Sequence, residues 1–245
     1  MEENFENKYH DVETNHWWFK SRRKYLIDLL KNCPKDSKIL DVGCSSGVFL
    51  KDLEKLGFNS DNLFGIDISE KAISNSKKNG LKNTFVMDAQ NITLDEKFDI
   101  IVASDCLEHL ENDRKALNNW SNLLNKKGQL FVFVPAFMSL WSYHDEVNMH
   151  FRRYKKNELK SKIENENLTV IKSSYWNFFL FVPIYIFRKI SSLFSPNKSG
   201  ESDIKIGNPI MNSVLLKLLI FENKLLKKIN SPFGVSTFCI AKKRD

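Results

Sequence analysis

A short glycine-spaced turn constrains the fold of this chain more than any other part of its sequence. Residues 38–47 read KILDVGCSSG, an apolar strand that ends in an acid and runs into two spaced glycines. Gly43 and Gly47 have no Cβ atom, so the backbone can turn sharply there and a ligand can lie against it. The amphipathic segment 48–56 predicts a helix whose first N–H groups lie beside the turn. Strand, turn and helix together predict a nucleotide-type site in an α/β fold.

Composition indicates one globular domain of ordinary size. The chain has 245 residues, of which 42% are hydrophobic and 27% charged, enough to bury a substantial core. Its four cysteines form no C-x-x-C pair and have no histidine at zinc spacing, so we expect reduced thiols, no metal site and a cytoplasmic protein. The polar start MEEN does not resemble a secretory signal.

The net charge of +7 comes largely from Lys/Asn-rich surface positions. The chain has no arginine-rich tract and no RNA-binding signature, so we expect no nucleic-acid partner. A solvated surface, a membrane surface and an acidic substrate remain alternative explanations of the charge.

Strand-like and helical segments alternate along most of the chain. Strands are predicted at 38–42, 62–67, 84–88, 98–104, 129–134, 168–174 and 234–242. Helices are predicted at 48–56, 69–78, 113–124 and 157–165, and a turn at 125–128. Because several strands are apolar on both faces, we expect a mostly parallel sheet covered by helices.

We expect a single domain, residues 1–245, made of four consecutive parts. These are an N-terminal helical lid (1–35), a cofactor-binding core (36–175), a hydrophobic helical insertion (176–233) and the last strand (234–245).

The insertion contains a strongly apolar run, a polar linker and an amphipathic helix. The helix is predicted at 210–229, with Val214, Leu218, Phe221, Leu225 and Ile229 on one face. The uncharged run 173–187 is too short to span a bilayer. Peripheral membrane contact through 176–230, a hydrophobic cap over the substrate pocket, and a dimer contact all explain the pattern. The chain is therefore expected to be a monomer or a homodimer.

Acidic or polar side chains follow four of the predicted strands. They are Asp41, Asp67, Asp88 and the pair Ser104 and Asp105. Parallel strands end along one crevice, where ligands bind, and Asp67 lies at a spacing suited to ribose hydroxyls.

The ligand at this crevice is expected to be cationic. The turn lacks the third glycine of a dinucleotide site, and Asp41 would repel a pyrophosphate. S-adenosylmethionine has an ammonium, a sulfonium and no phosphate, so Asp41 favours it. An NAD-linked oxidoreductase is the weaker alternative.

These segments resemble the class I S-adenosylmethionine-dependent methyltransferases, of the kind that methylate quinones and other small molecules. The matching segments are ILDVGCSSG (39–47), GIDIS (65–69), MDA (87–89), FDII (98–101), DCLEHL (105–110) and KGQL (127–130). Ser45-Ser46 stands where the family has Gly-Thr or Gly-Ser, and serine is small enough to keep the turn. The resemblance covers residues 36–175 and implies a Rossmann-like, seven-stranded, mostly parallel sheet whose last strand is antiparallel.

The resemblance also implies which residues bind the cofactor. Asp41 and Gly43 would face the methionine part, Asp67 the ribose, and Asp88 with Ala89 the adenine, while Ser104 and Asp105 would border the sulfonium. The full set is Asp41, Gly43, Cys44, Gly47, Asp67, Ile68, Asp88, Ala89, Ser104 and Asp105. The product would be S-adenosylhomocysteine.

Two further segments resemble a narrower subgroup, often encoded among genes for lipid or surface-polysaccharide synthesis. They are HWWF (16–19) with Arg22 and Arg23, and LWSYHD (140–145) with HFRRY (150–154). A hydroxyl acceptor needs a base, and His144 with Asp145, or His150, is a candidate. Acceptor-binding candidates are Trp17, Trp18, Arg22, Arg152, Arg153 and Tyr154.

Alternative roles remain for these residues. Asp145, Arg152 and Arg153 can form ion pairs that fold the loop, the tryptophans can pack in the core, and Glu108 and His109 can begin the next helix as cap and surface residues.

The expected reaction is methyl transfer to an oxygen or nitrogen of a small, amphiphilic acceptor. A lipid-linked compound, a quinone and a saccharide are the candidates. The protein is expected in the cytoplasm, and the inner face of the membrane is the alternative location. The non-catalytic alternative keeps the cofactor pocket and acts as a membrane-surface or partner-binding subunit.

Overall fold

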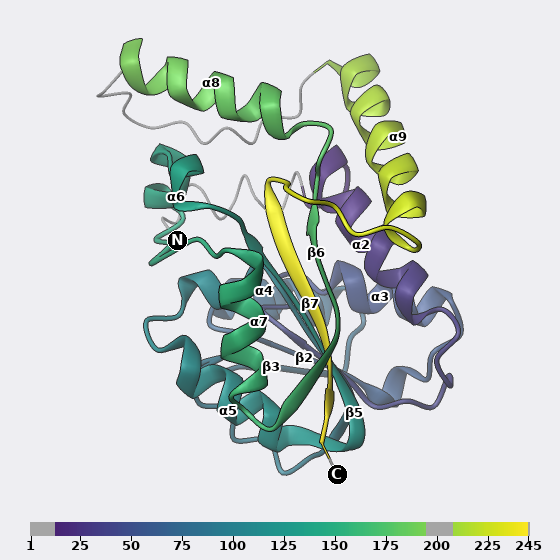
Figure 1. Cartoon of the computed structure of the whole chain (residues 1–245). Coiled ribbons are helices and arrows are strands. Elements are labelled where there is room, and N and C mark those ends of the chain that lie inside the picture. Colours follow the sequence, from purple (N-terminus) through teal and green to yellow (C-terminus); the bar gives the residue numbers. More distant parts are fainter. Residues whose placement is uncertain (1–12, 195–207, 245) are drawn as a thin grey trace.

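The computed structural model describes residues 13–194 and 208–244, and Figure 1 shows their arrangement. Within this part, seven strands form one sheet in the order β3-β2-β1-β4-β5-β7-β6. They are β1 (Ile39–Val42), β2 (Leu63–Asp67), β3 (Asn83–Val86), β4 (Phe98–Ser104), β5 (Leu124–Pro135), β6 (Leu168–Trp176) and β7 (Ser236–Lys243). Strand β7 is antiparallel to both β5 and β6, and the other pairs are parallel. The predicted sheet is confirmed.

Helices cover both faces of the sheet, which explains why the central strands are apolar throughout. One face packs against α2 (Trp17–Leu30), α3 (Val48–Lys55), α4 (Glu70–Lys78) and α9 (Pro209–Leu226). The other packs against α5 (Asp113–Leu123) and α7 (Lys156–Glu164). Two more helices, α6 (Tyr143–Val147) and α8 (Phe181–Phe194), follow the carboxyl ends of β5 and β6 (Figure 1). The carboxyl ends of the parallel strands therefore face a space bounded by α6 and α8.

The predicted turn at 125–128 lies inside β5 in the structure. Leu124 already pairs with Phe98, and the register between β4 and β5 then shifts before Ile100 pairs with Gln129. Lys127 takes a left-handed φ of 64° within this irregularity. Lys127 and Gly128 therefore form a bulge inside β5 and not a separate turn, because pairing with β4 begins before them, at Leu124.

The N-terminal helix is part of the core rather than a separate lid. Tyr25, Leu26 and Leu30 of α2 are buried against the sheet, and α2 also packs along α9. Only the first turn of the helix, with Trp17 and Trp18, borders the cavity described below. The first twelve residues of the predicted lid lie outside the described residues.

Helix α9 places much of its predicted apolar face outward. It buries Leu219 and Leu226, together with Glu222 and Asn223, whereas Val214 and Phe221 are exposed. The two buried polar side chains are satisfied: Glu222 accepts from the N–H groups that follow β6, and Asn223 accepts from Trp176 Nε1. The helix's own apolar side chains point in all directions around its axis, so hydrophobic periodicity alone could not predict which face is buried.

Among the described residues, no helix combines the length and the apolar character that crossing a bilayer requires.

Candidate active site

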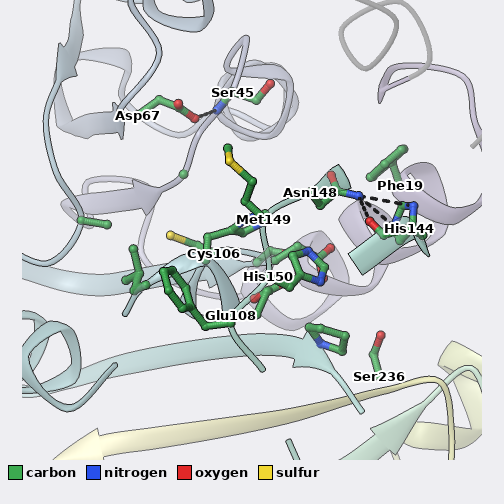
Figure 2. A pocket seen from close by; sticks show the side chains of 18 of the residues that line it. Phe19, Ser45, Asp67, Cys106, Glu108, His144, Asn148, Met149, His150 and Ser236 are labelled. Carbon is green, nitrogen blue, oxygen red and sulfur yellow. Dashed lines mark hydrogen bonds between the residues drawn. The ribbon is translucent and has the colours of Figure 1, made fainter. Parts of the chain in front are cut away.

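One cavity of about 1000 Å³ lies at the carboxyl ends of the strands. Its lining comes from the glycine turn, the ends of β2 to β5, the loop 144–153, the start of α2 and the inner side of α8. Figure 2 shows Asp67 and Ser45 at one part of the cavity and His144, His150 and Glu108 at another. The cavity therefore joins the predicted cofactor residues to the predicted acceptor loop.

The glycine turn has the backbone conformation that its sequence requires. Gly43 and Gly47 both have φ of 77°, in the left-handed region that favours glycine. A Cβ atom on Gly43 would lie 3.2 Å from Cys106 Cβ, and one on Gly47 would lie 2.1 Å from Leu81 Cδ1. Ser45 also has a positive φ, 49°, which explains why the resembling family has glycine there. The turn is held to the end of β2, because Ser45 N–H donates to Asp67 Oδ2 at 2.9 Å.

Predicted adenosine-binding residues lie along the same cavity. Asp67 ends β2, and its other carboxylate oxygen accepts from Ser69 N–H at 3.0 Å, which fixes the orientation of the carboxylate. Asp88 follows β3 and accepts from Gln90 N–H, also at a cavity wall. The predicted cofactor residues that line this cavity are Gly43, Asp67, Ile68, Asp88, Ala89, Ser104 and Asp105.

The remaining predicted cofactor residues lie elsewhere. Asp41 and Cys44 line a smaller adjoining cavity of about 70 Å³, which shares Gly43, Ser45 and Asp105 with the large one. Gly47 lines neither cavity and acts at the N-cap of α3.

The smaller cavity is rich in carboxylates. Burial, and then the charges of Glu13 and Asp67, raise the pKa of Asp41 from 3.8 to about 8. Glu13 itself accepts from the hydroxyls of Ser45 and Ser46 at 3.0 and 2.8 Å. A cationic ligand group would relieve the repulsion among these acids, so the site suits an ammonium and disfavours a phosphate.

Arg22 lies at this smaller cavity and not at the acceptor side. Its guanidinium forms an ion pair with Asp105, donates to Ser236 Oγ at 2.8 Å, and stacks near the rings of Trp18 and Trp176. The side chain is buried. The prediction that Arg22 contacts the acceptor is therefore not supported by its position, although it borders the methionine end.

The loop 144–153 forms a buried network around Asp145. Its carboxylate accepts from His150 Nδ1 at 2.9 Å and from Arg153 Nε and Nη2 at 2.7 and 3.0 Å. Burial alone would raise the pKa of Asp145, but these hydrogen bonds and the Arg153 charge hold it well below its usual range. Asp145 does not line the cavity, so its position suits orienting His150 and not a direct contact with the acceptor.

The predicted acceptor residues divide into two groups. Trp17, Trp18 and Arg153 line the large cavity. Arg152 and Tyr154 do not: Arg152 pairs with Asp113 at 3.1 Å, and the buried Tyr154 hydroxyl donates to the same carboxylate at 2.9 Å. The contacts of these two side chains are internal to the fold, and their positions do not support the predicted role in acceptor binding.

Sequence reasoning missed Glu108 and His109, which it treated as cap and surface residues. Both line the cavity, and Glu108 is only 1% exposed. Burial, followed by the charge of Asp105, raises the pKa of Glu108 well above its usual value. The signal in the sequence was their position directly after β4, at the end of a central strand.

The imidazoles of His109 and His144 are uncharged at neutral pH. Burial, and then the proximity of His150, lower the pKa of His109 to about 3. Burial, and then the charge of Arg188, lower that of His144 to about 3. Arg188 comes from α8, which also places Ile184 and Phe187 in the cavity wall. The apolar insertion therefore covers part of the cavity, one of the roles expected for it.

Comparisons with known proteins agree with this geometry. Residues 15–173 match the family described as a methyltransferase domain. The ubiquinone biosynthesis O-methyltransferase of Colwellia psychrerythraea is 32% identical over 120 residues, which are 46% of this chain and 47% of that protein. The enzyme of the same name from Rickettsia bellii is 25% identical over 167 residues, 61% of this chain and 70% of that protein. The match therefore spans about half the length of the first of these relatives.

Solved structures share the fold at low sequence identity. A SAM-dependent methyltransferase from Archaeoglobus fulgidus superposes with a TM-score of 0.60 at 20% identity, covering 96% of this chain and 99% of that one. The N-methyltransferase NodS from Bradyrhizobium japonicum, in complex with S-adenosyl-L-homocysteine, gives 0.59 at 15% identity, covering 96% and 91%.

Proposed function

Because this chain belongs to the class I S-adenosylmethionine-dependent methyltransferases, we propose that it methylates an oxygen or nitrogen of a small amphiphilic acceptor. The acceptor would occupy the part of the cavity between His109, His144 and α8. One observation supports this most directly: a single cavity joins the cofactor-binding strand ends to a buried histidine cluster under an apolar helix.

The residues of the two adjoining cavities fit S-adenosylmethionine. Asp67 would bind the ribose and Asp88 the adenine, while Asp41 and Glu13 would bind the ammonium group. The bound cofactor supplies a methyl group on a sulfonium. Asp105, at the end of β4 with a left-handed φ of 57°, lies where both cavities meet. This chain's own contribution is mainly to orient the two reactants and to exclude water.

The acceptor side of the cavity favours a molecule with a polar head and an apolar body. His144 and Asn148 provide polar contacts there, and Asn148 Nδ2 is within 3.3 Å of the His144 ring nitrogens (Figure 2). Ile184 and Phe187 of α8, with Trp17 and Trp18, provide apolar walls. A lipid-linked compound or a quinone fits these walls better than a free saccharide does.

We further propose that α8 and α9 contact an anionic membrane surface from the cytoplasmic side. Their outward faces carry a series of exposed apolar side chains: Val182, Ile186, Ile190, Ile210, Met211, Val214 and Phe221. Exposed lysines, Lys189, Lys217 and Lys224, lie on the same two helices and complement acidic headgroups. Exposed apolar surface of this extent usually marks an interaction site.

Cofactor binding is the first test of the proposed reaction. Isothermal titration with S-adenosylmethionine and S-adenosylhomocysteine should show micromolar affinity that Asp67→Ala abolishes. Asp61→Ala is the matched control, because Asp61 precedes the same strand but its exposed carboxylate pairs with Lys82, at 2.9 Å. Absence of binding to the wild type would refute the proposal.

Turnover separates an enzyme from a cofactor-binding subunit. Methyl-labelled cofactor should transfer its label to one compound in a lipid or quinone extract. Bound cofactor with no labelled product from lipid, quinone or sugar extracts would favour the non-catalytic alternative.

Vesicle flotation tests the membrane contact. The wild type should float with vesicles that contain phosphatidylglycerol, and the triple variant Val182→Ser, Ile186→Ser, Phe221→Ser should not. Ile171→Ser, which removes an exposed side chain on β6, is the control and should float normally. Equal recovery of all three proteins in the soluble fraction would rule out the membrane contact.

A further inference from the structure

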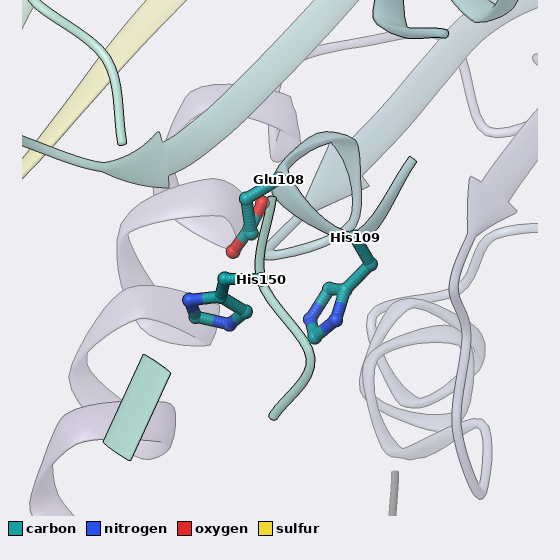
Figure 3. Close-up of side chains that lie close together, drawn as sticks. All are labelled: Glu108, His109 and His150. Carbon is teal, nitrogen blue, oxygen red and sulfur yellow. The ribbon is translucent and has the colours of Figure 1, made fainter. Parts of the chain in front are cut away.

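Three potential metal ligands converge in the wall of the large cavity. Glu108 and His109 lie on η2 (Leu107–His109), just after β4, and His150 comes from the loop after α6. One carboxylate oxygen and one nitrogen from each imidazole all lie within 4.8 Å of one another. Figure 3 shows the three side chains directed toward a common point.

The Glu108 carboxylate is buried, and the charges of Arg22 and Arg153 offset only part of the cost of that burial, because its pKa stays well above the usual value. Neither of its oxygens has a hydrogen-bond partner, although the residue is almost fully buried. A buried carboxylate is normally paired, hydrogen-bonded or bound to a metal ion. Its two nearest partners in the cluster are imidazoles, whose rings lie 4.5 Å apart in an edge-to-face arrangement. A cation placed among the three groups would satisfy the carboxylate.

Both histidines are held through one ring nitrogen, which leaves the other for a metal. Asp145 is buried and accepts from His150 Nδ1, so Nε2 is the nitrogen left to coordinate. Arg153 holds Asp145 in turn, at 2.7 Å. The backbone of Asn148 hydrogen-bonds to His109. Carboxylate–histidine and carbonyl–histidine contacts of this kind are the usual outer support of metal-bound histidines.

We propose that Glu108, His109 and His150 bind one divalent transition-metal ion, with an open coordination position toward the cavity. Two imidazoles and one carboxylate are a donor set that suits Zn²⁺ and similar ions. In a tetrahedral site with bonds of about 2.0–2.1 Å, ligand atoms lie about 3.4 Å apart. Small side-chain rotations would therefore close the present cluster onto an ion.

The open position gives the ion a place in the proposed reaction, and this step rests on the proposed function. An acceptor hydroxyl or phenol oxygen would fill that position, near Asp105 at the cofactor side of the cavity. Because a metal ion lowers the pKa of a bound oxygen, the acceptor would lose its proton to water before the methyl group passes from the sulfonium to the oxygen. His150 Nε2 would then be a ligand and not the general base considered from the sequence. The acceptor class narrows to compounds with an oxygen able to bind a metal.

Metal binding can be measured without the methyl donor or the acceptor. The untagged full chain, treated with chelator and desalted, should bind one equivalent of Zn²⁺ in isothermal titration. Co²⁺ should give the visible absorption bands of a four- or five-coordinate nitrogen–oxygen site. Glu108→Gln, His109→Ala and His150→Ala should each weaken Zn²⁺ binding at least tenfold.

Two further variants separate the site from a general loss of structure. His16→Asn is the control: His16 also lines the cavity but caps α2, accepting from Trp18 N–H, and asparagine keeps that acceptor. It should bind Zn²⁺ like the wild type. Asp145→Asn leaves all three ligands in place but weakens the support of His150 and removes the counter-charge of Arg153, so its Tm is measured alongside; it should weaken binding between tenfold and a hundredfold.

Several outcomes would overturn the metal site. One is that the wild type binds neither Zn²⁺ nor Co²⁺ stoichiometrically. Another is that the His16→Asn control loses as much Zn²⁺ binding as the three ligand variants do. If the wild type binds no metal and His150→Ala still loses methyl transfer, His150 would instead be identified as the general base. Failure of the metal site would leave the wild type without Zn²⁺ binding but with cofactor binding and labelled product. Failure of the proposed function would remove cofactor binding or the labelled product, whether or not Zn²⁺ binds, so the two are distinguishable.

Discussion

Replacing Arg153 by methionine should destabilise the protein strongly, because it leaves a buried carboxylate without its main counter-charge. The side chains of Arg153 and Asp145 are 2% and 0% exposed, and two N–H groups of the guanidinium donate to the carboxylate. A third donation, to the carbonyl oxygen of Ala136, ties the loop to the end of β5. Methionine has a similar volume, so the change removes charge and hydrogen bonds more than packing.

The expected loss of stability follows from the burial of the pair. Removing one partner of a buried ion pair costs about 3–5 kcal/mol. For a chain of this length, each kcal/mol lowers Tm by roughly 2–4 °C, so Tm should fall by about 6–20 °C. Asp145 keeps its hydrogen bonds from His150 and from Ser142 N–H, which places the loss toward the lower end. Urea unfolding and differential scanning fluorimetry measure both quantities.

The neighbouring arginine provides a matched control. Arg152→Met removes the same group one residue earlier, but the side chain is 27% exposed. Its partner Asp113 keeps Lys162 at 3.0 Å and the Tyr154 hydroxyl at 2.9 Å, so the loss should be about 1 kcal/mol or smaller. The double variant Asp145→Asn, Arg153→Met should be more stable than Arg153→Met alone, because no charge is left unpaired. A loss below about 1 kcal/mol in Arg153→Met, or an equal loss in Arg152→Met, would refute the reasoning.

Three more changes test other parts of the structure. Burial and two neighbouring acids raise the pKa of Asp41 from 3.8 to about 8 in the folded state. Because the folded state then holds this proton more tightly than the unfolded state, the free energy of unfolding should fall as pH rises from about 4 to 8. Urea unfolding of Asp41→Asn should show a smaller fall. Glu222→Ala should lose about 1–3 kcal/mol, because two N–H groups after β6 lose their acceptor, whereas Glu222→Gln keeps an acceptor and should lose less in the same assay. Gly47→Ala should lower Tm more than Gly57→Ala does, because both glycines have positive φ but only the first would bring a Cβ against Leu81.

The sequence was sufficient to predict the sheet, and it placed most of the strand-end acids at one cavity. Apolar strands separated by helical segments determine a covered parallel sheet, and acids at strand ends then converge because parallel strands end together. Asp67 and Asp88 reach the cavity by this rule alone. Gly43 and Gly47 have a positive φ, which few other residues adopt without strain, so glycine at these two positions indicated a sharp turn.

The acceptor side could not be predicted in the same way. The roles of Arg152, Arg153 and Tyr154 depend on the direction in which each side chain points from an irregular loop. The two adjacent arginines differ: Arg152 is partly exposed and pairs with Asp113, whereas Arg153 is buried and pairs with Asp145. The proposed metal ligands join the adjacent residues Glu108 and His109 to the distant His150, so a search for ligands at short spacing along the chain would not find the set. In α9, apolar residues surround the helix, and the buried face was decided by hydrogen bonds to Glu222 and Asn223.

Helix α8 connects the proposed membrane contact with the proposed chemistry. Ile184, Phe187 and Arg188 line the cavity, whereas Val182 and Ile186 of the same helix are exposed on its outer side. Arg188 also reaches the acceptor loop, donating to Leu140 O at 2.5 Å and lying 3.9 Å from the Asp145 carboxylate. Under these two proposals, an amphiphile at a membrane surface would meet one helix that touches both the bilayer and the loop 144–153. If both contacts exist, vesicles should raise the apparent affinity for an apolar acceptor without changing the affinity for the cofactor, because the cofactor residues lie on the sheet and not on α8.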